Sequence, residues 1–397
     1  MKISIGVVFG GRSVEHEISV ISAIQAINAV NKEKYTVTPI YISKQGKWYT
    51  GDALTNTDNY KNTDALLNRC TQVYLRPELG NNNLYCVKKK LFGTDVLTSL
   101  DIIFPILHGT TGEDGSFQGL IELTGIPYVG CNPLASANGM DKITMKMILR
   151  ESGIPVIDYT WFTDKQWFST RDKLISEIEN KLNYPVIIKP ANLGSSVGIS
   201  RATDRDELIR AVDTAAGYST RIIAEKMVVD LKEINCAVLG TADEKIPSVC
   251  EEPLKSGEIL SYQDKYMGGG KGGKTPSKGM QSTQRQIPAN LPENMSKKIQ
   301  SLACETFRVL SCEGVSRIDF IVDKQTDEIY VNEINTIPGS LSFYLWEATG
   351  ISFDELIDRL IDLSLKRSRE QEMKITSYNE NIFNITGGYK SGNRGTK

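Results

Sequence analysis

Two short segments near the end of the chain carry side chains that could bind a hard metal ion. The sequence RID, residues 317–319, falls in one predicted strand, and NEIN, residues 332–335, falls in the next. Because side chains alternate along a strand, Glu333 and Asn335 point the same way while the isoleucine between them enters the core. Asp319 on the neighbouring strand reaches the same place. Three oxygen ligands on one face suit Mg²⁺; the alternative is an exposed polar face.

Two further segments have features of a nucleotide site. Lys189 ends a predicted buried strand, and the Gly/Ser-rich loop that follows, residues 190–198, exposes backbone N–H groups that can bind an anion. The strand and linker IIAEKMVV, residues 222–229, can offer backbone groups to an adenine edge. Glu233, a few residues later, can bind ribose hydroxyls.

The sequence GGGKGGKT, residues 268–275, matches the phosphate-binding consensus G-x-x-x-x-G-K-[ST]. That motif requires a buried strand before it and a helix after it. The preceding residues 261–267 are polar and charged, and the following PSKG has no apolar period. We therefore interpret the segment as a lysine-bearing loop and the consensus match as a coincidence of composition.

Both histidines lie in glycine-flanked turns after predicted strands. His16 follows the first strand in GGRSVEHEIS, and His108 follows another in LHGTTGEDG. A single histidine is more often structural than catalytic. Ligands of α/β folds bind at the carboxyl ends of the strands, so this placement of both histidines favours a role in function.

The elements that position these residues follow an α/β pattern. The first 125 or so residues alternate strand and helix and predict a parallel sheet with crossover helices. A polar stretch within them follows the predicted strand 36–42 and continues through Asn83. Predicted strands further on cover 158–162, 185–189, 221–226, 234–239, 247–252, 314–322 and 328–335. Predicted helices cover 18–30, 140–151, 171–182, 205–215, 292–311 and 352–365.

Bulk composition excludes several classes of protein. A length of 397 residues predicts two or three domains, and a net charge of −2 argues against nucleic-acid binding. The longest apolar runs have strand length, so neither a membrane span nor a signal peptide is expected. Seven scattered cysteines without a CxxC pair are typical of a reduced, cytoplasmic protein.

Seven segments of the chain occur in the order seen in D-alanine–D-alanine ligases, which the chain resembles over roughly residues 3 to 365. They are GGRSVEHEIS, PILHGTTGEDGSFQGLIEL, GMDK, VIIKPANLGSSVGIS, DKY at 264–266, RIDF and NEINTIPG. The resemblance implies an ATP-grasp fold with an N-terminal parallel-sheet domain. It divides the chain into an N-terminal α/β substrate domain (1–130), a central lobe (131–229), a C-terminal Mg-binding lobe (230–366) and a polar tail (367–397).

The family resemblance also implies roles for individual residues. Those assigned to ATP are Lys142, Lys189, Ser196, Glu225, Lys226, Val228, Glu233 and Lys265. Asp319, Glu333 and Asn335 would hold two Mg²⁺ ions, with Mn²⁺ as an alternative. Glu15 would bind the ammonium of the first D-alanine, with Ser195 and Tyr266 steadying a lid and His108 beside the substrate. Arg317 and the backbone N–H of Gly339 would face the developing oxyanion.

The chemistry implied has two steps. A D-alanine carboxylate attacks the γ-phosphorus of ATP to give an acyl phosphate, and an acceptor amine then attacks the activated carbonyl. The lysine-rich residues 267–280 would extend the lid over the phosphates. By resemblance, the protein would be a cytoplasmic homodimer acting in peptidoglycan precursor synthesis.

The segment after Pro338-Gly339 departs from the family pattern. Ser340-Leu-Ser342-Phe-Tyr344-Leu-Trp346 is several residues shorter than the stretch that binds the acceptor carboxylate in the family. Ser340, Ser342 and Tyr344 are candidates for that binding. The acceptor could be D-alanine, D-serine, D-lactate or the second residue of another dipeptide. A non-catalytic nucleotide-binding regulator is the alternative from another class.

Overall fold

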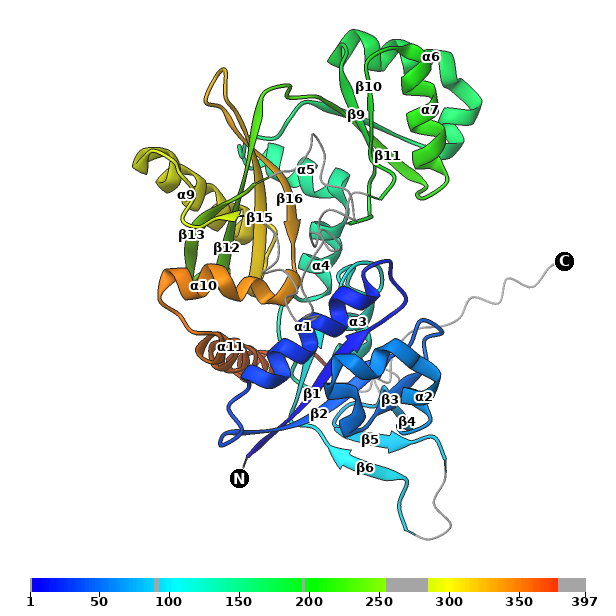
Figure 1. The fold of residues 1–397 in the computed structure, drawn as a ribbon, viewed down its shortest axis with the longest axis vertical. Coiled ribbons are helices and arrows are strands. Elements are labelled where there is room, and N and C mark those ends of the chain that lie inside the picture. The colour runs from blue at the N-terminus through cyan, green and yellow to red at the C-terminus, as the bar shows by residue number, and fades with distance from the viewer. Residues whose placement is uncertain (1, 89–92, 195–196, 255–284, 378–397) are drawn as a thin grey trace, which may run out of the picture.

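The computed structural model describes residues 2–88, 93–194, 197–254 and 285–377, which form three β-sheets with helices packed on them (Figure 1). Ser195, Ser196, Lys265, Tyr266 and the lysine-rich loop 267–280 lie outside the described residues. Within the described part of the chain, no helix is long and apolar enough to cross a membrane. All seven cysteines are free thiols.

The first sheet has seven strands in the order β6-β5-β4-β3-β2-β1-β7. Its parallel part contains β1 (Ile3–Gly10), β2 (Tyr35–Ile42) and β7 (Ile102–Ile106). Its antiparallel part contains β3 (Trp48–Thr50), β4 (Thr71–Leu75), β5 (Asn83–Cys86) and β6 (Val96–Ser99). The predicted parallel sheet is present in β1, β2 and β7, and four antiparallel strands extend it into a mixed sheet. The polar stretch before Asn83 contains short antiparallel strands whose weak apolar pattern hid them.

Helices and turns surround this sheet and lead out of it. They are α1 (His16–Ala29), η1 (Asp52–Thr55), η2 (Thr57–Asn62), α2 (Thr63–Leu67), α3 (Ser116–Thr124), α4 (Pro133–Met140) and α5 (Lys142–Glu151). The turn from β1 to α1 requires glycine, because Gly10 has a φ of 92° and an added β-carbon would lie 2.3 Å from the carbonyl oxygen of Ile42.

The second sheet has the order β10-β9-β11-β8 and is covered by two helices. Its strands are β8 (Tyr159–Thr163), β9 (Val186–Pro190), β10 (Ser200–Ala202) and β11 (Arg221–Lys226), and its helices are α6 (Asp164–Leu182) and α7 (Arg205–Ala216). A capping box begins α6: the Thr163 side chain binds the backbone N–H of Gln166, and the Gln166 side chain binds the backbone N–H of Thr163.

The third sheet has the order β14-β13-β12-β15-β16. Its strands are β12 (Leu231–Gly240), β13 (Lys245–Pro253), β14 (Arg285–Gln286), β15 (Gly314–Asp323) and β16 (Ile329–Asn335). The helix α9 (Glu293–Val309) packs its apolar stripe on one face, burying Ile299, Ala303 and Phe307 against the strands. The opposite face carries the polar residues of the candidate site.

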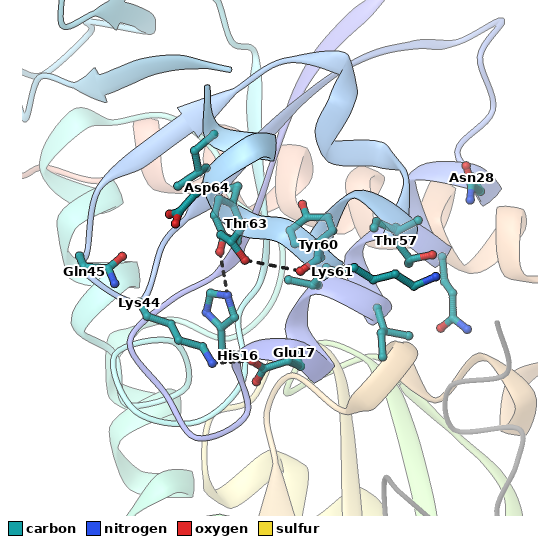
Figure 2. Close-up of a pocket in the computed structure, with 16 residues that line it drawn as sticks. His16, Glu17, Asn28, Lys44, Gln45, Thr57, Tyr60, Lys61, Thr63 and Asp64 are labelled. Carbon is teal, nitrogen blue, oxygen red and sulfur yellow. Dashed lines mark hydrogen bonds and ion pairs between the residues drawn. The ribbon is translucent and has the colours of Figure 1, made fainter. Parts of the chain in front are cut away.

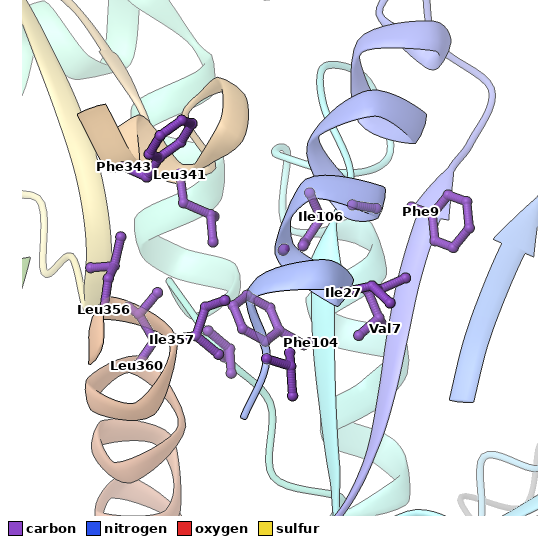
Figure 3. Packing of buried hydrophobic residues seen from close by; sticks show 14 of the residues in the cluster. Val7, Phe9, Ile27, Phe104, Ile106, Leu341, Phe343, Leu356, Ile357 and Leu360 are labelled. Carbon is purple, nitrogen blue, oxygen red and sulfur yellow. The ribbon is translucent and has the colours of Figure 1, made fainter. Parts of the chain in front are cut away.

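The end of the chain folds back onto its beginning. After β16 come η4 (Gly339–Ser342), α10 (Phe343–Thr349) and α11 (Phe353–Glu372), which extends past the predicted end at residue 365. Leu341, Phe343 and Leu356 belong to one hydrophobic cluster with residues of α1 and the first sheet, such as Ile27 and Phe104 (Figure 3). This shared core holds η4 against α1, so residues more than 300 positions apart form one site.

Candidate active site

A row of polar side chains crosses the face of the third sheet opposite α9. In the strand register, Asn235 on β12 lies opposite Glu251 on β13 and opposite Asp319 on β15, and Asp319 lies opposite Glu333 on β16. Directly cross-strand residues share a face, so these four side chains lie side by side. The predicted proximity of Asp319 and Glu333 is therefore confirmed.

Arg317 and Asp319 form a two-pronged ion pair on β15. Arg317 Nε donates to Asp319 Oδ1 at 2.6 Å and Nη2 donates to Oδ2 at 2.7 Å. Asn335 Nδ2 also donates to Asp319 Oδ2, at 3.1 Å. Burial would lower the pKa of Arg317, but the Asp319 carboxylate raises it well above its ordinary value. Arg317, which was expected to face the oxyanion, therefore binds Asp319, which was expected to hold the metal.

A β-bulge in β16 brings two neighbouring residues to the site. The register shifts between Asp319 and Phe320, which leaves Asn332 as an extra residue on β16. Asn332 Oδ1 accepts a hydrogen bond from Lys189 Nζ at 3.1 Å, while Glu333 Oε2 lies 3.2 Å from Lys142 Nζ. Simple alternation would place Asn332 on the core face, so its contact with Lys189 was missed. Ile334 is buried in the core as predicted.

A buried cluster of three lysines and a glutamate lies beside this bulge. Glu225 Oε2 lies 2.7 Å from Lys189 Nζ, and its Oε1 lies 2.9 Å from Lys146 Nζ. Burial alone would raise the pKa of Glu225, but the two ammonium groups lower it to about 2, while burial lowers the pKa of Lys146. Lys146 was not predicted, although it lies one helical turn after Lys142 on α5.

Lys142 connects α5 to the Gly/Ser loop after β9. Its backbone N–H donates to the carbonyl of Ala191, and its Nζ donates to the carbonyl of Leu193 at 2.8 Å. The ammonium group is therefore held between that loop and Glu333. Two of the predicted phosphate ligands, Lys142 and Lys189, approach the same part of β16 from different elements.

The other predicted ATP residues lie between β11 and β12. Lys226 ends β11 with an exposed side chain, and Val228 lies in the linker that follows. Glu233 on β12 shares the side of the strand that carries Asn235, so it lies on the polar face of the third sheet.

Glu15 lies where three loops meet. Its side chain is buried at the start of α1. An added β-carbon on Gly109 would lie 2.7 Å from Glu15 Oε2, and one on Gly194 would lie 3.0 Å from the same oxygen. The loops after β7 and β9 therefore both approach this carboxylate closely.

His108 belongs to a hydrogen-bonded chain that ends at the turn after β16. Its Nε2 lies 3.0 Å from Ser22 Oγ on α1, and Ser22 Oγ accepts the backbone N–H of Ser340 at 2.9 Å. Burial lowers the pKa of His108 to about 4, with a hydrogen bond to the Ile337 backbone opposing it. His108 is therefore neutral near pH 7 and positions η4 through Ser22.

Glu113 was not predicted as a site residue. Its Oε2 accepts the backbone N–H of Gly109 at 2.8 Å, and its Oε1 accepts the backbone N–H of Ile337 at 2.9 Å. Burial and the nearby Glu15 carboxylate raise the pKa of Glu113 to about 8. Within LHGTTGEDG the residue reads as part of a polar turn, and no local signal marks its distant partner.

The turn after Gly339 has an unusual backbone. Ser340, Leu341 and Ser342 have φ angles of 51°, 54° and 51°, in the left-handed region. This region costs a residue with a side chain about 1–2 kcal/mol. Buried contacts offset the strain: Ser340 Oγ donates to Gln25 Oε1 at 2.6 Å, and Leu341 packs into the core shared with α1. Strained segments of this kind cluster at functional sites.

His16, the second histidine, supports the β1–α1 turn rather than the site. Its Nδ1 donates to the carbonyl of Gly11 at 2.7 Å, and its Nε2 accepts from Tyr41 Oη at 3.0 Å. Burial lowers its pKa. It also borders a cavity of about 650 Å³ between α1 and residues 57–67, shown in Figure 2. Apart from His16, none of the residues singled out from the sequence lines that cavity.

The residues on β15 and β16 fit a divalent metal ion. Asp319, Glu333 and Asn335 supply hard oxygen atoms at adjacent register positions, and their side chains are partly buried. Within the described residues, no group of three or more His, Cys, Asp and Glu side chains could hold a metal. A metal here would therefore need further oxygens from phosphate groups and water, which is how Mg²⁺ is commonly held.

Comparisons with known proteins find similar sequences over almost the whole chain. Family models described as the D-ala D-ala ligase N-terminus and C-terminus match residues 4–131 and 148–362. The D-alanine–D-alanine ligase of Thermosipho melanesiensis is 39% identical over 388 residues, covering 97% of this chain and 99% of its own.

Two solved structures have a similar fold over almost the whole chain. The D-alanine–D-alanine ligase of Coxiella burnetii has a TM-score of 0.76 and 30% identity, covering 94% of this chain and 96% of its own. The D-Ala:D-Ser ligase of Enterococcus faecalis has a TM-score of 0.77 and 31% identity, covering 92% of this chain and 100% of its own.

Proposed function

The chain belongs to the D-alanine–D-alanine ligase family, and from that premise we propose that it joins two D-alanine molecules through an acyl phosphate formed with ATP. Membership makes it an ATP-dependent ligase with the ATP-grasp fold. The observation that carries the proposal is the convergence of two lysines, from α5 and β9, on the neighbouring residues Glu333 and Asn332 of β16.

Lys142 and Lys189 would bind the phosphates of ATP. Both ammonium groups are held in place by short contacts, Lys142 by Glu333 and Leu193, and Lys189 by Glu225 and Asn332. Phosphoryl transfer needs mainly alignment and neutralisation of charge, which fixed cations provide. Glu225 acts by positioning, because its buried carboxylate holds Lys189 and Lys146.

Asp319, Glu333 and Asn335 would hold Mg²⁺, in two ions or with Mn²⁺ in its place. Bound there, the metal would neutralise the negative charge of the transferring phosphate. Lys226, Val228 and Glu233 would surround the nucleoside. Ser196 and Lys265 would contact phosphates, and Ser195 and Tyr266 would close the lid with Glu15; these four roles rest on the family resemblance alone.

The donor D-alanine would lie between Glu15 and the strained turn. Glu15 carries the charge that an ammonium group needs, and the loops after β7 and β9 close around it. His108, neutral near pH 7, would lie beside this substrate without repelling its ammonium group. The donor carboxylate would then point toward the phosphates held by Lys142 and Lys189.

Formation of the peptide bond would use Arg317 and Gly339. The acceptor amine attacks the carbonyl carbon, the bond from that carbon to the phosphate oxygen breaks, and phosphate leaves as the amine loses a proton. Arg317 binds Asp319 through Nε and Nη2, so Nη1 would meet the oxyanion together with the N–H of Gly339. Loss of one such donor lowers the rate by on the order of 10²–10³-fold.

The product D-Ala–D-Ala would enter peptidoglycan precursor synthesis in the cytoplasm, where ATP is available, and the protein would act as a homodimer. Transfer to D-serine is the second candidate activity. It is favoured by the shortened segment 340–346 and by the TM-score of 0.77 with the D-Ala:D-Ser ligase, against 0.76 with the solved D-Ala–D-Ala ligase of Coxiella burnetii.

Positional isotope exchange tests the first step. ATP labelled with ¹⁸O at the β,γ-bridge is incubated with Mg²⁺ and D-alanine, and bridge-to-nonbridge scrambling is followed. Reversible formation of an acyl phosphate and ADP predicts scrambling that depends on D-alanine and is lost in Glu333→Ala. Scrambling that is absent, or equally fast without D-alanine, would contradict the proposed intermediate.

A further inference from the structure

Lys146 is a fully buried lysine behind the proposed phosphate site. It lies on α5 four residues after Lys142, so the two side chains occupy one side of the helix. None of the Lys146 side chain is exposed, and its Nζ lies 2.9 Å from Glu225 Oε1. Lysine is almost never fully buried unless it is paired, because an ammonium group is costly to remove from water. Glu225 is therefore the partner that allows this lysine to be buried.

Glu225 lies between two ammonium groups. Its Oε1 faces Lys146, and its Oε2 lies 2.7 Å from Lys189 Nζ. The exposure of the side chains rises along this row, from 0% for Lys146 to 2% for Glu225 and 9% for Lys189. Lys189 also donates a hydrogen bond to Asn332 Oδ1 at 3.1 Å. Lys189 is thus the most accessible of the three charged groups, and a phosphate that approaches the row meets it first.

The row contains more positive than negative charge. Burial would raise the pKa of Glu225, but the Lys146 and Lys189 ammonium groups lower it to about 2, so its carboxylate is ionised at neutral pH. With all three groups ionised, two ammonium groups and one carboxylate give the row a net charge of +1. Without the charge of Lys146, the carboxylate of Glu225 would cancel the charge of Lys189, and the row would be neutral.

We propose that Lys146 is a positioning residue that preserves the positive charge of Lys189 for the phosphates of ATP, because it shares the carboxylate that would otherwise neutralise Lys189. This inference rests on the proposed function, in which Lys189 binds phosphate. Charges interact strongly in the protein interior, where the effective dielectric constant is far below that of water. Lys146 therefore strengthens phosphate binding through Glu225 and Lys189, without touching the nucleotide.

The alternative is that Lys146 pairs with Glu225 only to stabilise the fold. Glu225 already has a closer partner in Lys189, at 2.7 Å against 2.9 Å. A second lysine adds repulsion to that pair: burial lowers the pKa of Lys146, and the ammonium groups of Lys189 and Lys142 lower it further. Apolar residues can replace buried charged groups with little loss of stability. The presence of a second ammonium group is therefore better explained by its charge than by the stability of the fold.

A binding experiment separates the two interpretations. The affinities of the full-length protein for Mg-ADP and for adenosine are measured by displacement of a fluorescent ADP analogue. Their ratio reports the contribution of the phosphates, because both ligands share adenine and ribose and any change in nucleoside contacts cancels. Lys146→Met lowers this ratio by roughly tenfold or more, since Glu225 then neutralises Lys189. An unchanged ratio in Lys146→Met overturns the proposal.

The double variant Lys146→Met/Glu225→Gln gives the sharper test. Lys189 alone then supplies the charge of +1, and the amide oxygen of the new glutamine still accepts its hydrogen bond, so the ratio returns close to that of wild type. A purely structural role predicts a ratio as low as in Lys146→Met or lower, because two native groups are lost. The double variant buries no unpaired charge, so it decides the case in which Lys146→Met does not fold. A double variant that is itself unfolded assigns the row to structure and overturns the proposal.

Steady-state kinetics and a matched control complete the experiment. Lys146→Met raises the KM for ATP and leaves the KM for D-alanine unchanged, whereas a loss of folded protein would lower kcat alone. Lys34→Met removes the same charge from an exposed pair with Asp358 and leaves both the binding ratio and the KM for ATP unchanged. A shift of the same size in Lys34→Met overturns the proposal. Wild type that binds Mg-ADP no more tightly than adenosine overturns the phosphate site itself, and with it the proposed function.

Discussion

Glu113 Oε1 accepts a hydrogen bond from the backbone N–H of Ile337, which lies 224 residues further along the chain, at a distance of 2.9 Å. The same carboxylate accepts the N–H of Gly109 through its other oxygen. Glu113 therefore joins the loop that carries His108 to the turn that leads into Gly339. One side chain thus links the loop of the proposed donor site to the turn of the proposed oxyanion site.

Glu113→Ala leaves two buried N–H groups without their acceptor. We expect the free energy of unfolding to fall by about 1–3 kcal/mol and turnover to fall by on the order of tenfold or more, because Ile337 positions Gly339. Urea denaturation and initial rates measure both effects. Glu151→Ala, at an exposed helix end, is the control. Unchanged turnover in Glu113→Ala would show that this link does not position the site.

His108 makes stability depend on pH. Because its folded pKa is about 4 and its unfolded pKa is about 6.5, the unfolded chain gains a proton that the folded chain does not accept. The contribution of this group to the free energy of unfolding is complete above pH 6.5. It decreases by about 3 kcal/mol as the pH falls toward 4. His108→Asn should flatten this dependence in denaturation measurements across that range. An equally steep loss in the variant would refute the assignment.

Glu225 stabilises two buried ammonium groups at once. Glu225→Gln leaves Lys146 and Lys189 without their carboxylate and should reduce the free energy of unfolding by about 3–5 kcal/mol. Lys146→Met should reduce it less, because Glu225 keeps Lys189 at 2.7 Å. The exposed pair Lys173–Glu177 is the control, and Glu177→Gln should change stability by less than about 1 kcal/mol. Denaturation at pH 7 gives all three values; the reverse order for the two buried residues would contradict the account.

Ser342→Gly should separate stability from activity. Glycine relieves the left-handed backbone and removes an unpartnered hydroxyl, so we expect a gain of about 1 kcal/mol. The KM for the acceptor should rise while that for ATP does not. Asp327→Gly, at a φ of 58° in an exposed turn, is a matched control that should gain stability without any change in KM. If both variants have the same acceptor KM as wild type, Ser342 has no part in acceptor binding.

Alternation along strands explains which site residues could be predicted. Period-two patterning on β15 and β16 predicted that Asp319, Glu333 and Asn335 share a face, and the register agrees. Asn332 could not be assigned in this way, because a bulge shifts the alternation by one residue and depends on cross-strand pairing. Patterning could not predict β3 either, because a strand of three residues is too short to show a period.

Contacts between distant segments explain what could not be predicted. Glu113 and Ile337, or Glu251 and Arg285, meet only because the chain end packs onto α1 and β13 pairs with β14. Neither pair has a local motif. The left-handed turn at residues 340–342 is equally hidden, because Ser-Leu-Ser lacks the glycine that usually marks such a backbone. Lys146 did leave a signal, its spacing of four from Lys142.

The identity of the product tests the central claim most directly. Purified protein is incubated with Mg-ATP and an equimolar mixture of D-alanine, D-serine and D-lactate, and the products are identified by mass with phosphate release measured alongside. The account predicts D-Ala–D-Ala as the main product, with one phosphate released per dipeptide. D-Ala–D-Ser as the main product would support the second candidate activity. Absence of any D-alanine-dependent product, with ATP and metal bound, would contradict the proposed ligase reaction.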